Sequence, residues 1–262
     1  MYGICKDMDT LAISNPHERD SHITFQDEGH IYTIDGETDF MSVTRWNHSH
    51  FKPFDADRII ASMMARDSWP NSKYFGKTPE QIKAEWDANR DASADAGTKL
   101  HYDIECYYNG CPQKNDSIEY QYFLHFAQQN ADLVPFRTEW MVWDKELRFA
   151  GSIDMVFIKP DGSLMIYDWK RSKGIQKGNS WGDCATTPCI SHLPDSNFWH
   201  YSLQLNTYKA LLEKNYKHRV SEMRLVCCHP CHKDYQVFTV PDLSTEIADL
   251  FEVRREMLTS SA

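Results

Sequence analysis

The sequence predicts an α/β protein in which a central mixed β-sheet is flanked by helices, with a helical and hairpin elaboration at the N-terminus. Three observations lead to this prediction. Residues 149–158 and 163–170 are apolar runs separated by a turn, and helical periodicity precedes and follows them. The elements come in the order helix, helix, three strands, helix, two strands, helix. A chain of 262 residues, 41% of them hydrophobic, can bury the core of one large domain.

The first part of the sequence, up to about residue 95, predicts a short hairpin and two helices. Residues 22–34 alternate loosely between apolar and polar side chains, which predicts a short hairpin. A helix is expected over residues 55–66. Another helix begins after Thr78, because Pro79 suits the first helical position and Gln81 completes a capping box with the threonine.

Residues 96–110 predict a separate amphipathic helix, because apolar side chains recur at helical spacing. His101 and Glu105 are four residues apart and therefore share one face. By themselves they also fit an ordinary polar helix surface. Gly97, near the expected helix start, would allow close approach of another chain or offer its N–H to a phosphate.

The later expected strands and helices carry several polar side chains of interest. Glu139 lies in an expected strand, and His200, Gln204 and Tyr208 form a polar stripe along an expected helix. The expected helices span residues 117–130, 197–214 and 242–257, and the expected strands outside the central hairpin span residues 136–143, 222–228 and 235–240.

A Pro-Asp-Gly turn at residues 160–162 fixes the register of the central hairpin. Proline presets φ for the turn and glycine can adopt the left-handed conformation that ends it. Centring the hairpin on this turn places Val156 opposite Ile166 and Asp154 opposite Asp168. The two carboxylates are therefore expected on the same face of the sheet.

Two opposed carboxylates destabilise a hairpin unless something compensates their charge. A divalent cation between Asp154 and Asp168 would do so, since Mg²⁺ prefers carboxylate oxygens. Lys170 follows on the same face and could orient an attacking water. The pattern indicates a metal-dependent phosphodiesterase; the competing interpretation is a surface hairpin with scattered charges.

Composition and charge limit the classes of protein. No apolar run reaches the ~18 residues of a membrane span, and residues 1–20 lack the pattern of a secretory signal. Eight cysteines at irregular spacing indicate reduced thiols, so an intracellular, non-secreted protein of the cytoplasm, the nucleus or a virus-infected cell is expected. The net charge of −10 argues against a protein that coats nucleic acid, although a nuclease can be acidic.

The segment at residues 171–196 is expected to be a long loop, because it is rich in Gly, Ser, Thr, Asn and Pro. It contains Lys173, Lys177 and Trp181. Cationic and aromatic side chains beside the site suit a lid over a nucleic-acid strand, and a disordered insertion is the alternative.

Five blocks of polar residues follow one another along the chain. They are Gly97-Thr98 with His101 and Glu105, then Glu139, then Gly151-Ser152-Ile153-Asp154, then Asp168-Trp169-Lys170, and last Gln204 with Tyr208. Blocks of these residues in this order resemble the PD-(D/E)XK nuclease superfamily, and more narrowly its RecB-type exonuclease branch. The resemblance covers roughly residues 95–240 and implies a restriction-endonuclease-like core. We expect residues 96–262 to form this core and residues 1–95 to pack on it as an elaboration.

The resemblance implies a metal site for one or two Mg²⁺ or Mn²⁺ ions. His101, Asp154 and Asp168 would be ligands, together with the backbone carbonyl of Trp169. Lys170 would position and activate the attacking water.

The resemblance also assigns the surroundings of the site. Glu139 would lie at its edge, as a supporting residue or as a ligand of a second metal, and Glu105 would support His101. The substrate-binding positions it implies are Gln204, Tyr208, Gly97, Thr98 and Ser152, to which the loop adds Lys173.

The function expected from this resemblance is a metal-dependent DNA exonuclease that leaves 5′-phosphate products, in DNA processing, recombination or repair. DNA ends, single- or double-stranded, are the expected substrate, and unwinding would require a helicase, polymerase or recombinase partner. Two alternatives stay open: an endonuclease on RNA or DNA, similar to the viral cap-snatching enzymes, and a nucleic-acid-binding module without activity. Polarity and oligomeric state are left open.

The cysteines raise the question of a second metal site, since several RecB-type relatives carry an iron–sulfur cluster. Cys5 with Cys227, Cys228 and Cys231 would give four ligands, but adjacent strand residues point to opposite faces. A zinc site of Cys227, Cys231 and His232 would need a second pair such as Cys184 and Cys189. Reduced structural thiols are therefore expected, and an iron–sulfur cluster is not.

Overall fold

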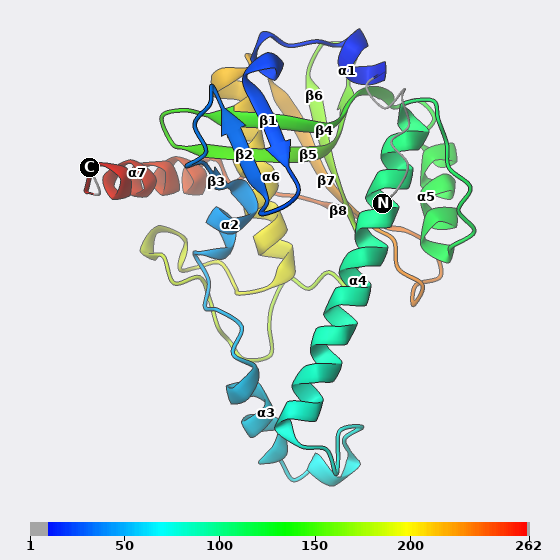
Figure 1. Ribbon diagram of the computed structural model, residues 1–262, viewed down its shortest axis with the longest axis vertical. Coiled ribbons are helices and arrows are strands. Elements are labelled where there is room, and N and C mark those ends of the chain that lie inside the picture. The colour runs from blue at the N-terminus through cyan, green and yellow to red at the C-terminus, as the bar shows by residue number, and fades with distance from the viewer. Residues whose placement is uncertain (1–9, 261–262) are drawn as a thin grey trace.

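The structure, a computed structural model, describes residues 10–260 (Figure 1). Its α-helices are α1 (Thr10–Ser14), α2 (Val43–His48), α3 (Ala56–Met64), α4 (Pro79–Tyr108), α5 (Ile118–Gln129), α6 (Asn197–Asn215) and α7 (Ser244–Ser260). Its strands are β1 (Ile23–Gln26), β2 (Ile31–Ile34), β3 (Met41–Ser42), β4 (Val134–Asp144), β5 (Phe149–Ile158), β6 (Leu164–Lys170), β7 (Val220–Cys227) and β8 (Gln236–Thr239). Short 3-10 helices span Glu18–His22, Trp69–Asn71 and Pro188–Ile190.

The central sheet is mixed, as predicted. β5 pairs with β4 along its whole length, and β6 pairs antiparallel with β5 and parallel with β7, which β8 follows antiparallel. β3, which the sequence did not reveal, adds a two-residue parallel pairing at the start of β5. The predicted N-terminal hairpin is present as a separate antiparallel pair, β1 with β2.

The central hairpin of β5 and β6 has the predicted register, with Val156 paired to Ile166. Gly162 ends the turn at a φ of +78°, a conformation that glycine adopts without strain. The paired residues end at Met155 and Tyr167, although β6 goes on pairing with β7 as far as Lys170. The two strands therefore diverge just where the sequence predicted the opposed carboxylates.

Helix α4 corrects one prediction, because the two helices expected after Thr78 and over residues 96–110 are a single helix of 30 residues. Its start is as predicted, with Thr78 and Gln81 forming the capping box. No proline interrupts residues 80–108, and one glycine costs only about 1 kcal/mol relative to alanine, so the helix continues. Gly97 consequently lies in the helix interior rather than near its start, and the division at residues 95 and 96 falls inside α4.

Helices cover both faces of the sheet. α4 and α5 pack on one face, where Leu100, Phe123 and Trp169 are buried together. α2, α6 and α7 pack on the other face around a larger apolar cluster that includes Trp46, Phe149 and Leu211. The N-terminal half of α4 extends beyond the sheet and meets α3 there (Figure 1). Each helix within residues 10–260 is too short or too polar to cross a lipid bilayer.

His50 is a buried histidine that should make stability depend on pH. It is 2% exposed, its Nδ1 lies 2.8 Å from Thr187 Oγ1, and burial lowers its pKa to about 4. The unfolded chain, with a histidine pKa of about 6.5, binds more protons between these values, so the free energy of unfolding should fall as pH drops from about 6.5 to 4. Urea titrations at several pH values in this range would measure the free energy of unfolding. His50→Gln should reduce the slope of this free energy against pH by up to about 1.4 kcal/mol per pH unit.

The surface substitution His192→Gln is the matched control, since that side chain is 58% exposed. If the slope of the unfolding free energy against pH is unchanged in His50→Gln, or changes equally in the control, His50 is not the source of the pH dependence.

Candidate active site

Four elements meet where β5 and β6 diverge. β5 contributes Asp154, β6 contributes Asp168 and Lys170, β4 contributes Glu139, and α4 contributes His101. Asp154 and Glu139 lie across from one another, because the pairs on either side of them are Met155 with Thr138 and Ile153 with Trp140.

His101, Glu139 and Asp154 form a compact group of ligand atoms. The Nδ1 of His101 lies 3.5 Å from Asp154 Oδ2 and 3.9 Å from Glu139 Oε1. Within residues 10–260, these three form the one group of at least three His, Cys, Asp or Glu side chains whose ligand atoms all lie within 4.8 Å of each other. One imidazole nitrogen and carboxylate oxygens suit Mn²⁺ or Mg²⁺, so the donor set fits the expected divalent ion.

Glu139 reaches this group through a strained backbone. Its φ is +41°, in the left-handed region that non-glycine residues rarely adopt. The Oγ of Ser152 donates a 2.7 Å hydrogen bond to Glu139 Oε2 and fixes the carboxylate. Such strain persists where the surroundings enforce it, and it is common at functional sites.

The backbone of Trp169 ties two of the three side chains together. Its N–H donates to Asp154 Oδ2 over 2.9 Å, in the place of a sheet hydrogen bond to β5. His101 Nε2 lies 2.9 Å from the Trp169 carbonyl oxygen. If Nε2 carries the proton that this carbonyl accepts, Nδ1 is left to face the carboxylates, the arrangement that orients a metal-binding histidine. The expected role of this carbonyl as a metal ligand stays a prediction.

Asp168 is held by Lys170 rather than by the group of three. Lys170 Nζ lies 2.6 Å from Asp168 Oδ2, and the side chains are 17% and 4% exposed. Burial alone would lower the pKa of Lys170, but the charges of Asp168 and Asp154 outweigh it and raise that pKa. The ring of Tyr201 lies 4.5 Å from Nζ. Lys170 is therefore a fixed positive charge beside the carboxylates.

The carboxylates and the histidine lie close together in a half-buried setting, so the charge of each affects the pKa of the others. Burial, followed by the charge of Asp168, raises the pKa of Asp154 to about 7. Burial alone would lower the pKa of His101, but the charges of Asp154 and Glu139 raise it to about 9. For Glu139, burial alone would raise the pKa, but His101, the hydrogen bond from Ser152 and the charge of Lys170 together outweigh it and lower the pKa. The group thus attracts positive charge, and binding of a metal there should release protons.

The residues of the expected substrate side line the same region. Gly97, Thr98, Ser152 and Glu105 line a cavity of about 690 Å³ together with His101. Apart from the adjoining backbone of α4, no atom lies within 4 Å of the point where a Cβ on Gly97 would stand, so this face of α4 is open. The support that Glu105 was expected to give His101 stays a prediction.

Tyr208 and Gln204 lie on α6, and their terminal atoms are 3.5 Å apart. Tyr208 is only 3% exposed, and a Cβ on Gly151 would lie 2.8 Å from its ring. The ring therefore packs directly on the β5 backbone, three residues before Asp154. Lys173 is exposed in the loop after β6.

Two site residues were not singled out from the sequence. Tyr201 precedes Tyr208 by seven residues and lies on the same face of α6, so helical periodicity could have indicated it. Gly151 was noted only as part of a block, although a glycine inside a strand often marks the close approach of another group.

The cysteines follow the expected geometry. Cys227 packs in the apolar cluster on the α6 face of the sheet and Cys228 in the cluster on the α5 face. The Sγ of Cys227 donates to Ser172 O over 3.1 Å, and Cys231 lies beside His232. Cys5, the first ligand considered for an iron–sulfur cluster, lies outside the described residues.

Comparison with known proteins gives one family match. The family model described as the PD-(D/E)XK nuclease superfamily matches residues 78–259. No curated protein matches the sequence.

Two solved structures are similar to this chain at low sequence identity. One is a candidate exonuclease from Eubacterium rectale, 9% identical, with a TM-score of 0.41 over 63% of this chain and 65% of that one. This chain thus spans slightly less than two thirds of that protein. The other, SSO0001, is 13% identical, with a TM-score of 0.36 over 84% of this chain and 77% of its own.

Proposed function

This chain belongs to the PD-(D/E)XK nuclease superfamily, and we propose that it is a divalent-metal-dependent exonuclease that hydrolyses DNA from an end and leaves 5′-phosphates. Members of this superfamily are nucleases that use divalent metals. The proposed substrate is DNA with a free end, and the proposed role is in DNA processing, recombination or repair. Unwinding of a duplex would come from a partner such as a helicase.

The observation that carries the proposal is the group of His101, Glu139 and Asp154 beside Lys170 and its partner Asp168. These three residues would hold Mg²⁺ or Mn²⁺, with Asp168 adjacent to them. A bound ion would supply the positive charge that stabilises the transition state at phosphorus.

The remaining steps fall to side chains of this chain. Lys170 orients the attacking water by donating a hydrogen bond to it, and Asp168 holds the ammonium in place over 2.6 Å. Trp169 keeps Asp154 and His101 in register through its N–H and carbonyl groups. Tyr208 and Gln204 are proposed to fix the strand from the α6 side.

Removal of metal provides the test. Purified protein should degrade end-labelled linear DNA with Mg²⁺ or Mn²⁺, leave covalently closed circles of the same sequence intact, and lose all activity in EDTA. Its products should accept a label from polynucleotide kinase only after phosphatase treatment, because their 5′ ends already carry phosphate.

A lysine of the central hairpin outside the site provides the control. Lys159→Met, at the end of β5, removes a lysine of the same hairpin that lies outside the site and should cut like the parent. Cutting of closed circles or of RNA would replace the exonuclease by an endonuclease. Absence of any cutting with either metal would leave nucleic-acid binding as the function.

A further inference from the structure

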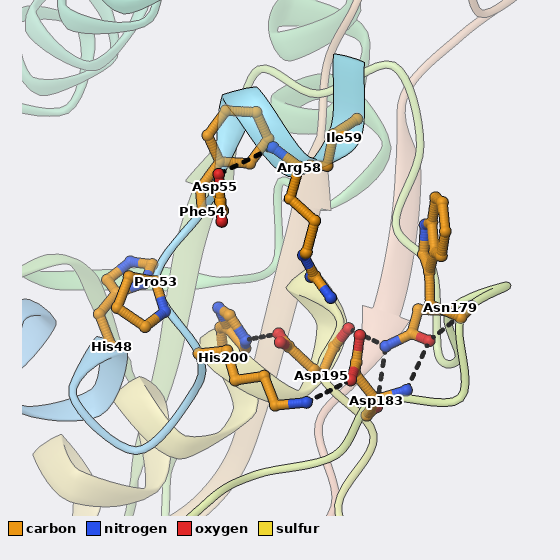
Figure 2. A pocket seen from close by; sticks show the side chains of 12 residues that line it. His48, Pro53, Phe54, Asp55, Arg58, Ile59, Asn179, Asp183, Asp195 and His200 are labelled. Carbon is orange, nitrogen blue, oxygen red and sulfur yellow. Dashed lines mark hydrogen bonds and ion pairs between the residues drawn. The ribbon is translucent and has the colours of Figure 1, made fainter. Parts of the chain in front are cut away.

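A second cavity lies beside the N-terminal end of α6. It measures about 390 Å³ and is bounded by the segment between α2 and α3, the loop after β6 and the start of α6 (Figure 2). His200, which lines it, directly precedes Tyr201, whose ring lies 4.5 Å from Lys170 Nζ. The cavity is therefore a neighbour of the proposed active site.

Two large aromatic side chains line the cavity and are open to solvent. Phe54 is 73% exposed and Trp181 is 54% exposed. The guanidinium of Arg66 lies 5.2 Å from the Trp181 ring and adds a positive charge to that wall. Exposed aromatic faces close to cations are the surfaces on which single-stranded nucleic acids stack their bases.

Arg58 supplies a cation to the cavity. Its side chain extends from α3 into the cavity (Figure 2), and its guanidinium makes no hydrogen bond or ion pair within residues 10–260. Three carboxylates line the same cavity. Asp55 Oδ1 accepts the backbone N–H of Arg58 over 2.9 Å, and the charge of Arg58 contributes to the lowered pKa of Asp183. Asp183 is bound by Lys52 over 2.7 Å and Asp195 by His200 over 2.9 Å. The five donors of Arg58 are thus available to a phosphate.

The loop that carries Trp181 is held in place. Asn179 Nδ2 donates to the carbonyl oxygens of Asp183 and Asp195 over 2.8 and 2.6 Å. Its Oδ1 accepts from the backbone N–H groups of Trp181 and Asp183 over 3.0 and 3.1 Å. These bonds order the part of residues 171–196 that carries Trp181, which argues against the disordered insertion; the role as a lid over a nucleic-acid strand stays a prediction. A prearranged pocket loses less entropy on binding.

We propose that this cavity binds one unpaired nucleotide of the strand being cut, with its base against Phe54 and Trp181 and a phosphate on Arg58. The inference rests on the proposed nuclease function and specifies its substrate as a single-stranded end. The volume of the cavity lies in the range of about 300–1,000 Å³ that is typical of small-molecule pockets. Paired bases inside a duplex are stacked on one another, so only an unpaired nucleotide can turn its base into this cavity while its phosphate reaches Arg58.

Binding in EDTA tests the inference without cleavage. Fluorescence anisotropy would compare a fluorescein-labelled 12-nucleotide single strand with a blunt duplex of the same length. Trp181→Ala, Phe54→Ala and Arg58→Gln should each raise the Kd for the single strand about tenfold and change the Kd for the duplex little. Since all three side chains are exposed, the variants should fold, which circular dichroism would verify.

Matched controls separate this effect from a general loss of charge or apolar surface. Phe75→Ala removes a phenylalanine that is 58% exposed and lies outside the cavity, and Arg90→Gln removes an exposed arginine on α4. Both should bind like the parent. Arg58→Lys should recover only part of the affinity, because lysine lacks the planar fork of donors.

The outcomes distinguish the two proposals. Parent-like binding by the three cavity variants, with metal-dependent cleavage intact, would overturn this inference and leave the nuclease function standing. Equal weakening for the single strand and the duplex would overturn the assignment to an unpaired nucleotide. A parent protein that neither binds nor cuts any nucleic acid would overturn both.

Discussion

Replacement of Lys170 by methionine is expected to slow cleavage by about 10²- to 10³-fold at saturating Mg²⁺, with little change in Mn²⁺ affinity. Methionine keeps the apolar stem of the side chain but cannot donate a hydrogen bond to the attacking water, and loss of one such group costs about this factor. The metal ligands stay in place because Lys170 touches Asp168 rather than His101 or Glu139. Single-turnover rates and calorimetric titration with Mn²⁺ would measure the two quantities separately.

The same substitution leaves Asp168 buried without its partner, which typically costs about 3–5 kcal/mol of stability. The double variant Lys170→Met/Asp168→Asn removes that buried charge. It should recover most of the lost stability and none of the activity. A Lys170→Met protein that is folded and cuts within tenfold of the parent would contradict the role of the lysine.

Replacement of Asp154 by asparagine should abolish both cleavage and metal binding, and yet stabilise the metal-free protein. Asparagine keeps the shape and can still accept the Trp169 N–H, but it removes the negative charge that a divalent ion needs. Cleavage should fall by at least about 10³-fold, since metal and orientation are lost together.

The stability effect follows from the sign of the pKa shift. Burial and Asp168 raise the pKa of Asp154 to about 7, so the fold binds more protons than the unfolded chain between pH 4 and 7. Stability without metal should therefore fall as the pH rises through this range, and the variant should escape that loss. Thermal melts in EDTA at pH 8 should show a higher Tm for Asp154→Asn than for the parent.

Asp132→Asn, on an exposed turn, serves as the matched control. It should leave the cleavage rate, the Mn²⁺ affinity and the Tm in EDTA unchanged. A lower Tm in EDTA for Asp154→Asn, or Mn²⁺ affinity equal to that of the parent, would contradict the account of the site.

The sequence was sufficient to predict the central hairpin because local chemistry determines it. A Pro-Asp-Gly turn has few conformations, and the side-chain period of two then assigns faces, so the pairing of Val156 with Ile166 follows. The start of α4 was predictable for the same reason, since Thr78 and Gln81 satisfy free N–H groups within one turn. Such features depend on residues that are neighbours in the chain.

The composition of the site was harder to predict, because it depends on where strands separate. The sequence placed Asp154 opposite Asp168. In the structure the pairing of β4 with β5 brings Glu139 to Asp154, and the divergence of β5 and β6 leaves Asp168 with Lys170. The left-handed backbone of Glu139 has no local signal such as a glycine. The continuity of α4 past Gly97 was also missed, because one glycine is too small a penalty to end a long helix.

The hydrogen bond from the Trp169 N–H to Asp154 has an evolutionary consequence. A descendant that gave up catalysis could discard the carboxylate charge freely, but alanine at this position would strand a backbone donor at the point where two strands separate. Asparagine would be the least disruptive route to such an inactive descendant. Selection for folding alone would therefore keep a hydrogen-bond acceptor at position 154 after selection for cutting had ended.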